Sequence, residues 1–596
     1  MLEKFAKLLN AGKAKITPLT EKIGKFLNSG RAKIIFIVLS ILSTGFFGVY
    51  LLTKPQMTTC FQKTAFYAIF IAFFTWLAVF PYSIPRTWNT LVDFFRRRGF
   101  PIGLALVLTI AAFLTSPVRF RILADETNLM GMAQAMYDFH EFYNPTQVLY
   151  YYEGITNVIS SEYDKRPVVF PFLVYLAHSF FGYNDNNGFV VNAISSFLLL
   201  LFFYVFLERF FSRLLATAGV ILLAAFPLVV LWMTSCGFEI PNLLFAVLAF
   251  IALERFLEHK TARDAEFLVL TLLILSQVRY ESVLFAIVIL PLVPLFLPSS
   301  EYPQLSWRTI IIPPFFLPIV WQRLTTWGQA LFQMEGDKPP FSTIWLIPNL
   351  KSAWAFFTGA KTAYGMIPVV FDAAISGFLL ALVLLILRRK EISLKNLTLF
   401  GTAFTLIFLN CAVLFLYYWG NLTLQYAIRL GLLYVPFLVF SVIYFLNFLT
   451  DNGTKFRRSI ILVAVALLFY SWPRAGINSS VREILLFREF AAAQRFLRAN
   501  YPGKEILLIS DRSNLYTPFR YSGVNFGYVN ANPDGIMINL KYKLFQDVLA
   551  LQRINYKDDK PCPETFLMDA FKTETLFETQ LSEEQKLRIA RVKPAK

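Results

Sequence analysis

Charge is scarce in this chain, and so are histidine and cysteine. Only 16% of the 596 residues are charged, whereas soluble domains carry about 25%. The four cysteines lie far apart without a CxxC motif and there are three histidines, so no zinc motif or disulfide framework can be recognised. With 56% hydrophobic residues, a soluble protein of this length could not cover its domains with polar surface. The composition excludes disordered, fibrous and disulfide-rich secreted proteins and indicates a polytopic membrane protein.

Long apolar runs are abundant. A spanning helix needs about 20 apolar residues, and on this basis the chain is predicted to be an α-helical polytopic membrane protein with about 13 transmembrane helices. The predicted spans are 34–53, 64–82, 101–118, 188–207, 214–234, 238–256, 266–279, 281–298, 309–322, 368–388, 397–418, 427–448 and 459–474. The preceding segment, 1–33, is basic and amphipathic and is predicted to lie on the cytoplasmic face of the membrane.

The net charge is +18 (56 − 38), which in a soluble protein would suggest a nucleic-acid partner. In this chain the positions of the basic residues instead indicate an orientation in the membrane. Basic residues gather in short loops that alternate with apolar runs, and such loops face the cytoplasm. We therefore predict a multi-pass protein of the cytoplasmic (inner) membrane with a cytoplasmic N-terminus. The predicted inner loops contain Arg86, Arg96, Arg97, Arg98, Arg209, Arg213, Arg255, Lys260, Arg263, Arg388, Arg389, Lys390, Lys395, Lys455, Arg457 and Arg458.

Two large segments then lie outside, in the periplasm. The first outer loop, 119–187, opens with Asp125 and Glu126 and continues as an amphipathic surface helix. Its apolar stretch at 168–182 is predicted to be a half-buried interfacial helix. The second, 475–596, is more polar and is predicted to be a small extracytoplasmic α/β domain with helices at 483–499 and 537–553 and a strand at 505–510.

The order and sidedness of several motifs resemble the GT-C superfamily of membrane glycosyltransferases. A span, a short link and the Asp125-Glu126 pair precede a surface helix, and a Lys165-Arg166-Pro segment precedes an apolar helix that ends in Phe-Gly. The nearest relatives resemble the protein O-mannosyltransferases and the lipid A aminoarabinose transferase. The similarity covers about 101–474, so that 34–100 adds two further spans and 475–596 is an outer domain of the kind that many members have.

The resemblance implies catalytic roles for three acids. Asp125 would be either the general base for an acceptor hydroxyl or a ligand of a divalent metal ion. Glu126 completes the pair, and Glu239 resembles the second acidic residue of the family and is the other candidate metal ligand. Each has a structural alternative: a helix N-cap for Asp125, a cap of the surface helix for Glu126, and a fully hydrated interfacial acid for Glu239.

Four basic residues are candidates to hold a donor phosphate. Lys165 and Arg166 could bind phosphate as a point charge and a bidentate fork respectively, although Arg166 departs from the more common Lys-Pro-Pro pattern. Arg279-Tyr280-Glu281 resembles the Thr-Arg-Pro-Glu segment of the family with Tyr280 in place of proline, and Arg429 resembles an Arg-Tyr element at the outer end of a span. The alternatives are contacts with lipid headgroups, an internal charge pair and an interfacial anchor.

These features predict an inverting glycosyltransferase that moves a sugar from a polyprenyl-phosphate donor to an acceptor hydroxyl on the outer face. Nucleotide sugars are not expected there, so the donor would be lipid-linked. The acceptor, whether protein, lipid or glycan, and the identity of the sugar stay open, as does the need for a metal ion. Two alternatives remain: a lipid or solute transporter, and a non-catalytic GT-C-like scaffold.

Overall fold

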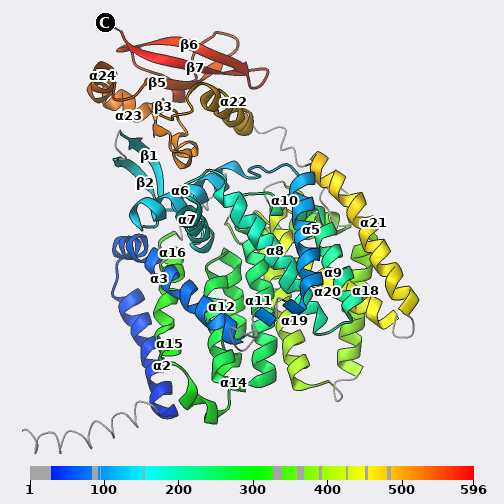
Figure 1. Ribbon diagram of the computed structural model, residues 1–596. Coiled ribbons are helices and arrows are strands. Elements are labelled where there is room, and N and C mark those ends of the chain that lie inside the picture. Colours follow the sequence, from blue (N-terminus) through cyan, green and yellow to red (C-terminus); the bar gives the residue numbers. More distant parts are fainter. Residues whose placement is uncertain are drawn as a thin grey trace, which may run out of the picture.

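The computed structural model describes residues 29–83, 92–93, 96–151, 155–326, 339–358, 368–387, 392–424, 427–449, 454–478 and 485–595. Most of the predicted basic segment 1–33 lies outside these ranges. Helices make up most of the described chain as far as Asn478, and the strands gather in a smaller part that lies beyond one end of the helical bundle (Figure 1).

The helical part begins with α2 (Gly30–Gly45), which continues into the π-helix η1 (Phe46–Tyr50). The other α-helices before residue 260 are α3 (Lys54–Ser83), α5 (Gly99–Thr115), α6 (Leu123–Phe139), α7 (Val169–Phe181), α8 (Asn187–Glu208), α9 (Arg213–Ala225), α10 (Pro227–Met233) and α11 (Glu239–His259). The later ones are α12 (Ala262–Ser276), α13 (Val283–Ile289), α14 (Leu292–Phe296), α15 (Trp307–Ile311), α16 (Leu317–Thr326), α17 (Leu346–Phe357), α18 (Pro368–Leu387), α19 (Leu394–Leu416), α20 (Val435–Leu449) and α21 (Thr454–Asn478).

Within the described ranges, six helical segments are long and apolar enough to cross a membrane by themselves, or seven if α9 and α10, bent by 72°, count as one broken span. The six are Gly30–Tyr50, Lys54–Pro81, Asn187–Glu208, Glu239–His259, Leu394–Leu416 and Ile428–Leu449. The prediction of about 13 crossings is therefore not confirmed, although a helix overlaps each predicted span.

Large apolar side chains cover the outer surface of the helical bundle. Phe408 is 73% exposed and Phe469 is 72% exposed, on helices whose opposite faces join a continuous apolar core. Water would penalise such a surface heavily, whereas lipid tails match it. The chain is therefore a multi-pass membrane protein.

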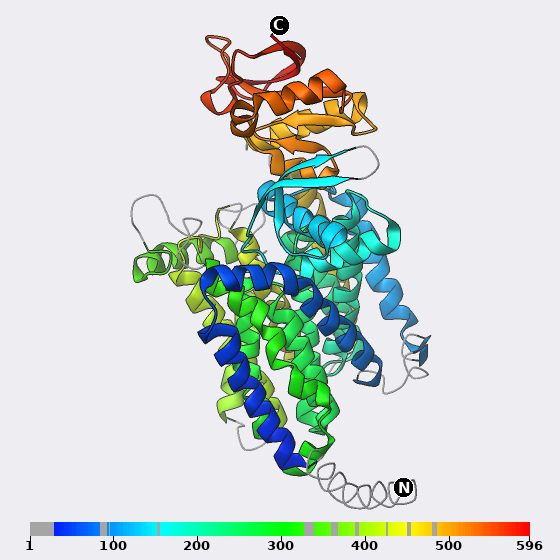
Figure 2. The same ribbon diagram turned by 90° about the vertical axis from the view of Figure 1, so that its left-hand side faces the viewer.

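The strands form one seven-stranded sheet in the order β2-β1-β4-β3-β5-β7-β6. Figure 2 shows the strands beyond the end of the helical bundle. They are β1 (Asn144–Tyr150), β2 (Thr156–Glu162), β3 (Ile506–Ile509), β4 (Ser522–Val524), β5 (Asp547–Asn555), β6 (Phe571–Gln580) and β7 (Gln585–Pro594). β3 runs parallel to β4 and β5, and the other pairs are antiparallel. Helices α22 (Leu485–Asn500), α23 (Phe526–Ala531) and α24 (Pro533–Tyr542) pack with the sheet.

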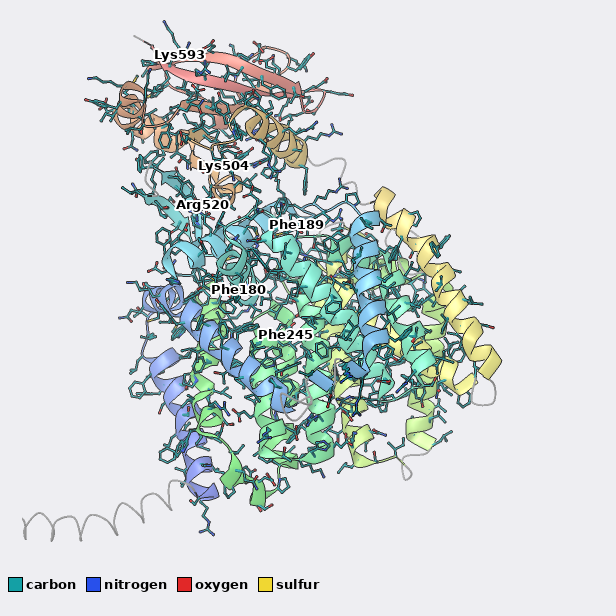
Figure 3. The ribbon with its side chains drawn as sticks, in the orientation of Figure 1. Phe180, Phe189, Phe245, Lys504, Arg520 and Lys593 are labelled. Carbon is teal, nitrogen blue, oxygen red and sulfur yellow. The ribbon has the colours of Figure 1, made fainter. Side chains whose placement is uncertain are left out.

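This sheet joins the segment 119–187, the predicted first outer loop, to the C-terminal segment. The hairpin of β1 and β2, which the sequence analysis did not predict, lies against β4, and the Tyr150 amide donates to Ser522 Oγ at 2.8 Å. Arg520, at the junction in Figure 3, pairs with Asp138 of α6 at 2.6 Å and lies 4.1 Å from the ring centre of Tyr183. The C-terminal domain, 485–595, is thus fastened to the segment that carries Asp125.

One helix of the outer domain is predicted wrongly. The segment 537–553 was expected to be a single helix, but α24 ends at Tyr542 and β5 begins at Asp547. Residues Val548 to Leu551 are all buried because β5 is an interior strand covered on both faces. A short continuous apolar run of this kind fits a buried strand and a helix equally well.

Candidate active site

Asp125 lies in the first turn of α6, where the carboxylate is 21% exposed. The helix begins at Leu123 with Ile122 as its N-cap, so Asp125 is not the capping residue. Its two oxygens accept from two different arginines: Oδ1 from Arg166 Nη2, and Oδ2 from Arg429 Nη2 at 2.5 Å. Burial alone would raise the pKa of Asp125, but the charges of Arg166 and Arg429 outweigh it and hold that pKa well below its ordinary value.

The two arginines arrive from distant parts of the chain. Arg166 precedes α7 and also pairs with Asp164, whose Oδ1 accepts from the Arg166 amide at 2.7 Å. Arg429 belongs to the 3-10 helix η8 (Ile428–Tyr434), and its Nη1 lies 3.3 Å from Glu239 Oε1 at the start of α11. Three separate segments therefore meet at Asp125.

Glu239 and Glu126 form a buried pair of acids behind Asp125. Glu239 is 2% exposed and Glu126 is 1% exposed, so neither is a hydrated surface acid. Glu126 Oε2 accepts from the Arg121 amide at 2.9 Å, which agrees in part with the expected capping role. Burial, followed by the negative charge of Glu239, raises the pKa of Glu126 to about 8. A side chain at Gly237 would place its Cβ 2.3 Å from Glu239 Oε2, so the Glu239 carboxylate would have to shift to make room for it.

Arg279 lies beside this group and is 2% exposed. Its Nε is 3.0 Å from Glu281 Oε1, as the alternative of an internal charge pair expected, and its Nη1 donates to the Arg429 carbonyl at 3.5 Å. The ring of Phe238 supports both cations, with its centre 5.4 Å from the Arg279 guanidinium and 5.9 Å from that of Arg429. Arg279 therefore belongs to the same cluster as Arg429.

Lys165 lies next to Arg166 in the sequence and faces an aromatic ring. Its Nζ lies 5.9 Å from the ring centre of Trp419, which the sequence suggested only as a member of an interfacial aromatic belt. Burial, and then the charge of Arg166, lowers the pKa of Lys165. We define the ion-pair cluster as Asp125, Asp164, Arg166, Glu239, Arg279, Glu281 and Arg429.

Sequence reasoning missed two residues that lie beside this arrangement, both on α16. Gln322 of α16 donates to the carbonyls of Asp164 and Arg166 at 3.1 and 2.7 Å and so fixes the segment that carries Arg166. Arg323, next along α16, lies over the ring of Tyr280 at 4.7 Å. Neither gave a signal in the sequence, because both lie at or just beyond the end of an apolar run.

A divalent metal ion does not fit this arrangement at Asp125 and Glu239. Both oxygens of Asp125 and one of Glu239 face guanidinium groups, whose positive charge opposes a cation. Carboxylate oxygens that bind Mg²⁺ or Ca²⁺ must point their lone pairs at the ion. The described residues also hold no group of three or more His, Cys, Asp or Glu side chains that could bind a metal.

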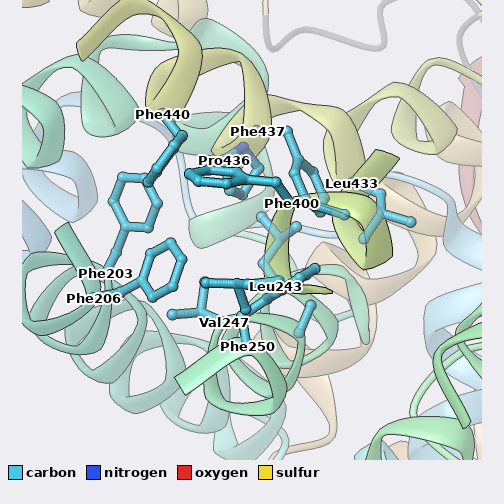
Figure 4. A pocket seen from close by; sticks show the side chains of 13 residues that line it. Phe203, Phe206, Leu243, Val247, Phe250, Phe400, Leu433, Pro436, Phe437 and Phe440 are labelled. Carbon is cyan, nitrogen blue, oxygen red and sulfur yellow. The ribbon is translucent and has the colours of Figure 1, made fainter. Parts of the chain in front are cut away.

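An apolar groove opens between α8, α11, α19 and the segment η8–α20 (Figure 4). Its empty space, including the part that is open to the surroundings, is about 600 Å³. The lining is Phe203, Phe206, Leu243, Ala246, Val247, Phe250, Leu399, Phe400, Ala403, Leu433, Pro436, Phe437 and Phe440. Leu433 and Arg429 lie on the same 3-10 helix, so this element belongs both to the groove and to the ion-pair cluster.

Comparison with known proteins gives one family match. The family model described as dolichyl-phosphate-mannose-protein mannosyltransferase matches residues 165–321, a stretch that contains Lys165, Arg166, Glu239 and Arg279. No curated protein sequence matches the chain. The match confirms the predicted resemblance to the GT-C membrane glycosyltransferases, because protein mannosyltransferases are one of the groups that the sequence resembles.

Solved structures of two such enzymes are also similar. ArnT from Cupriavidus metallidurans bound to undecaprenyl phosphate is 9% identical with a TM-score of 0.47, covering 82% of this chain and 98% of that one. The oligosaccharyltransferase from Archaeoglobus fulgidus, in complex with Zn and sulfate, is 13% identical with a TM-score of 0.45, covering 75% of this chain and 67% of that one. At TM-scores below 0.5, these similarities do not define the site.

Proposed function

We propose that this protein is a glycosyltransferase that uses a polyprenyl-phosphate-linked sugar as its donor and transfers the sugar to an acceptor hydroxyl. The observation that carries the proposal is the meeting of one half-buried carboxylate, Asp125, with two arginines from distant segments. Arginine forks suit phosphate, and a carboxylate suits a hydroxyl proton. The family match at residues 165–321 supports the same chemistry.

In this proposal Arg429, Arg279, Arg166 and Lys165 hold the donor phosphate, and Asp125 is the base. The acceptor oxygen attacks the anomeric carbon of the sugar while its proton passes to Asp125. The bond between the anomeric carbon and the phosphate oxygen breaks, the electron pair leaves with the polyprenyl phosphate, and the configuration inverts. The arginines stabilise the negative charge that develops on the departing phosphate.

Asp125 must first be released from its arginine partners. With both oxygens bound to guanidinium groups it is a poor proton acceptor. A donor phosphate offers Arg429 or Arg166 a competing anion, and the exchange would free a carboxylate oxygen for the acceptor hydroxyl. Donor binding would thereby prepare the base, so that the donor binds before the acceptor.

The apolar groove supports a lipid-linked donor. Its lining is entirely hydrophobic, and η8 carries both Leu433 in the groove and Arg429 in the ion-pair cluster. A polyprenyl chain needs such a surface between helices, and its phosphate needs cations at one end of it. We assign the isoprenoid chain to this groove.

The topology and domains follow the same proposal. The N-terminus and the basic loops would face the cytoplasm, with 1–33 on the inner surface, 34–100 as two additional spans and 101–474 as the GT-C-like region of about 13 crossings in all. Residues 475–596 would form a periplasmic domain over the site. Arg209 and Lys395 come from two predicted inner loops, and both pair with Glu254, Lys395 at 2.5 Å. These pairs support the placement of the two loops on the same, inner face of the membrane.

The test is Asp125→Asn, measured as sugar transfer by membranes and as the sugar mass on envelope material of a deletion strain complemented with each variant. We expect Asp125→Asn to abolish transfer, and Asp534→Asn, the same change at an exposed site of the outer domain, to behave as wild type. Transfer at the wild-type rate by Asp125→Asn would refute the base assignment. Solute movement without a covalent product would favour a transporter instead.

A further inference from the structure

The arginines of the ion-pair cluster are already engaged with carboxylates. Arg166 is shared between Asp125 and Asp164, and Arg429 between Asp125 and Glu239. Arg279 is paired with Glu281. These three guanidinium groups face four carboxylates, so an incoming phosphate meets a cluster whose cations are neutralised and must displace an acid to bind there.

Arg323 differs from them. It makes no ion pair within the described part of the chain, and its Nη2 is buried with no hydrogen-bond partner there. Its guanidinium lies 4.7 Å from the ring centre of Tyr280, which supplies a π-face but no charge. A buried N–H donor without an acceptor is costly, so this orphan donor is a reason to expect a ligand.

The surroundings connect Arg323 to the ion-pair cluster. The ring of Tyr280 meets the ring of Phe238 at 6.2 Å, and Phe238 in turn supports Arg279 and Arg429. On the same helix as Arg323, Gln322 holds the carbonyls on either side of Lys165. Arg323 is therefore connected, through the rings of Tyr280 and Phe238 and through its neighbour Gln322, to the residues that the proposed function assigns to the donor phosphate.

We propose that Arg323, carried on the ring of Tyr280, is a further phosphate-binding residue that contacts the polyprenyl-phosphate donor. This inference rests on the proposed function. It also gives a role to Tyr280, which replaces the proline of the related family segment. An aromatic ring at this position provides the platform that a proline could not, and it leaves the fork of Arg323 free to donate to phosphate oxygens.

The ligand chemistry is a phosphate, which a donor or an ordinary anionic lipid could supply. The experiment uses the full-length protein in nanodiscs of zwitterionic lipid, to which undecaprenyl phosphate, uncharged undecaprenol or phosphatidylglycerol is added, with binding measured by thermal shift and titration. The variants are Arg323→Gln, Arg323→Lys and Tyr280→Leu. Arg495→Gln, the same charge loss at an exposed position of α22, is the matched control.

We expect Arg323→Gln to weaken undecaprenyl phosphate binding by at least about tenfold, as the loss of a charge-assisted hydrogen bond implies. The affinity of Arg323→Gln for undecaprenol should not change. For undecaprenyl phosphate, Arg323→Lys should retain part of the affinity and Tyr280→Leu should lose affinity as Arg323→Gln does. Arg495→Gln should bind undecaprenyl phosphate as the wild type does. A purely structural role would change undecaprenol binding equally.

Three results overturn the inference. Equal affinity of wild type and Arg323→Gln for undecaprenyl phosphate excludes the contact. An equal loss for undecaprenol shows that Arg323 acts only on the fold, and a loss confined to phosphatidylglycerol assigns the residue to lipid headgroups. If the wild-type protein does not bind undecaprenyl phosphate, both the proposed function and this inference are wrong. If the wild-type protein binds it and the affinity does not depend on Arg323, only this inference is wrong and the proposed function stands.

Discussion

Glu126→Gln tests the buried acid pair behind Asp125. Burial and the neighbouring charge of Glu239 raise the pKa of Glu126 to about 8, so the side chain carries a proton at neutral pH and glutamine is its closest mimic. A carboxyl group whose pKa is raised by folding stabilises the fold at low pH. That stabilisation is lost as the pH rises from the unfolded-state value through the folded-state value. The window therefore runs from 4.5 to about 8.

The magnitude follows from the size of the shift. A rise from 4.5 to about 8 corresponds to at most about 5 kcal/mol of stability lost across the window. Glutamine does not titrate, so Glu126→Gln should remove this part of the pH dependence. At neutral pH the variant should be at least as stable as wild type.

The assay is the apparent Tm of the purified protein between about pH 5 and pH 9, as the linkage between proton binding and stability requires. We expect the Tm of wild type to fall with rising pH relative to that of Glu126→Gln. Glu583→Gln, at an exposed position of the outer domain, should follow wild type. Parallel curves for wild type and Glu126→Gln would refute the protonated state of Glu126.

Three further changes address other parts of the site. Arg429→Gln leaves the carboxylate of Glu239 buried without the Arg429 guanidinium. We expect the free energy of unfolding to fall by about 3 kcal/mol, seen as a lower Tm, and sugar transfer to be lost. Gly237→Ala should displace the Glu239 carboxylate, because the new Cβ would lie 2.3 Å from Oε2. Sugar transfer should fall while the Tm changes little. Full transfer activity would contradict the close approach. Ala246→Phe should narrow the apolar groove. It should weaken the binding of donors with long polyprenyl chains but not the binding of short-chain analogues. Equal effects on both kinds of donor would exclude the groove as the binding site of the chain.

Sequence reasoning located the site residues one at a time but not their mutual contacts. The predicted topology puts Asp125, Glu239 and Arg429 near one membrane face. Their separation along the chain gives no indication that Arg429 contacts both acids. Arg323 could not be recognised, because its role depends on the ring of Tyr280, which only the packing of α16 brings near.

The fold shows the same limit. Apolar length is a local property, so the long helices could be predicted well. The hairpin of β1 and β2 has a polar outer strand and irregular register at Gln147, which weakens the alternation that identifies strands. Its pairing with β4 joins Val148 to Gly523, a contact between residues hundreds of positions apart that no local pattern encodes.

The measurement that bears most directly on the proposed mechanism is a structure determined with undecaprenyl phosphate bound. We predict that the phosphate lies within hydrogen-bond distance of Arg429 or Arg166, and that at least one of these arginines has left Asp125. A phosphate bound elsewhere, or an Asp125 that keeps both arginine partners beside the bound phosphate, would contradict the exchange that prepares the base.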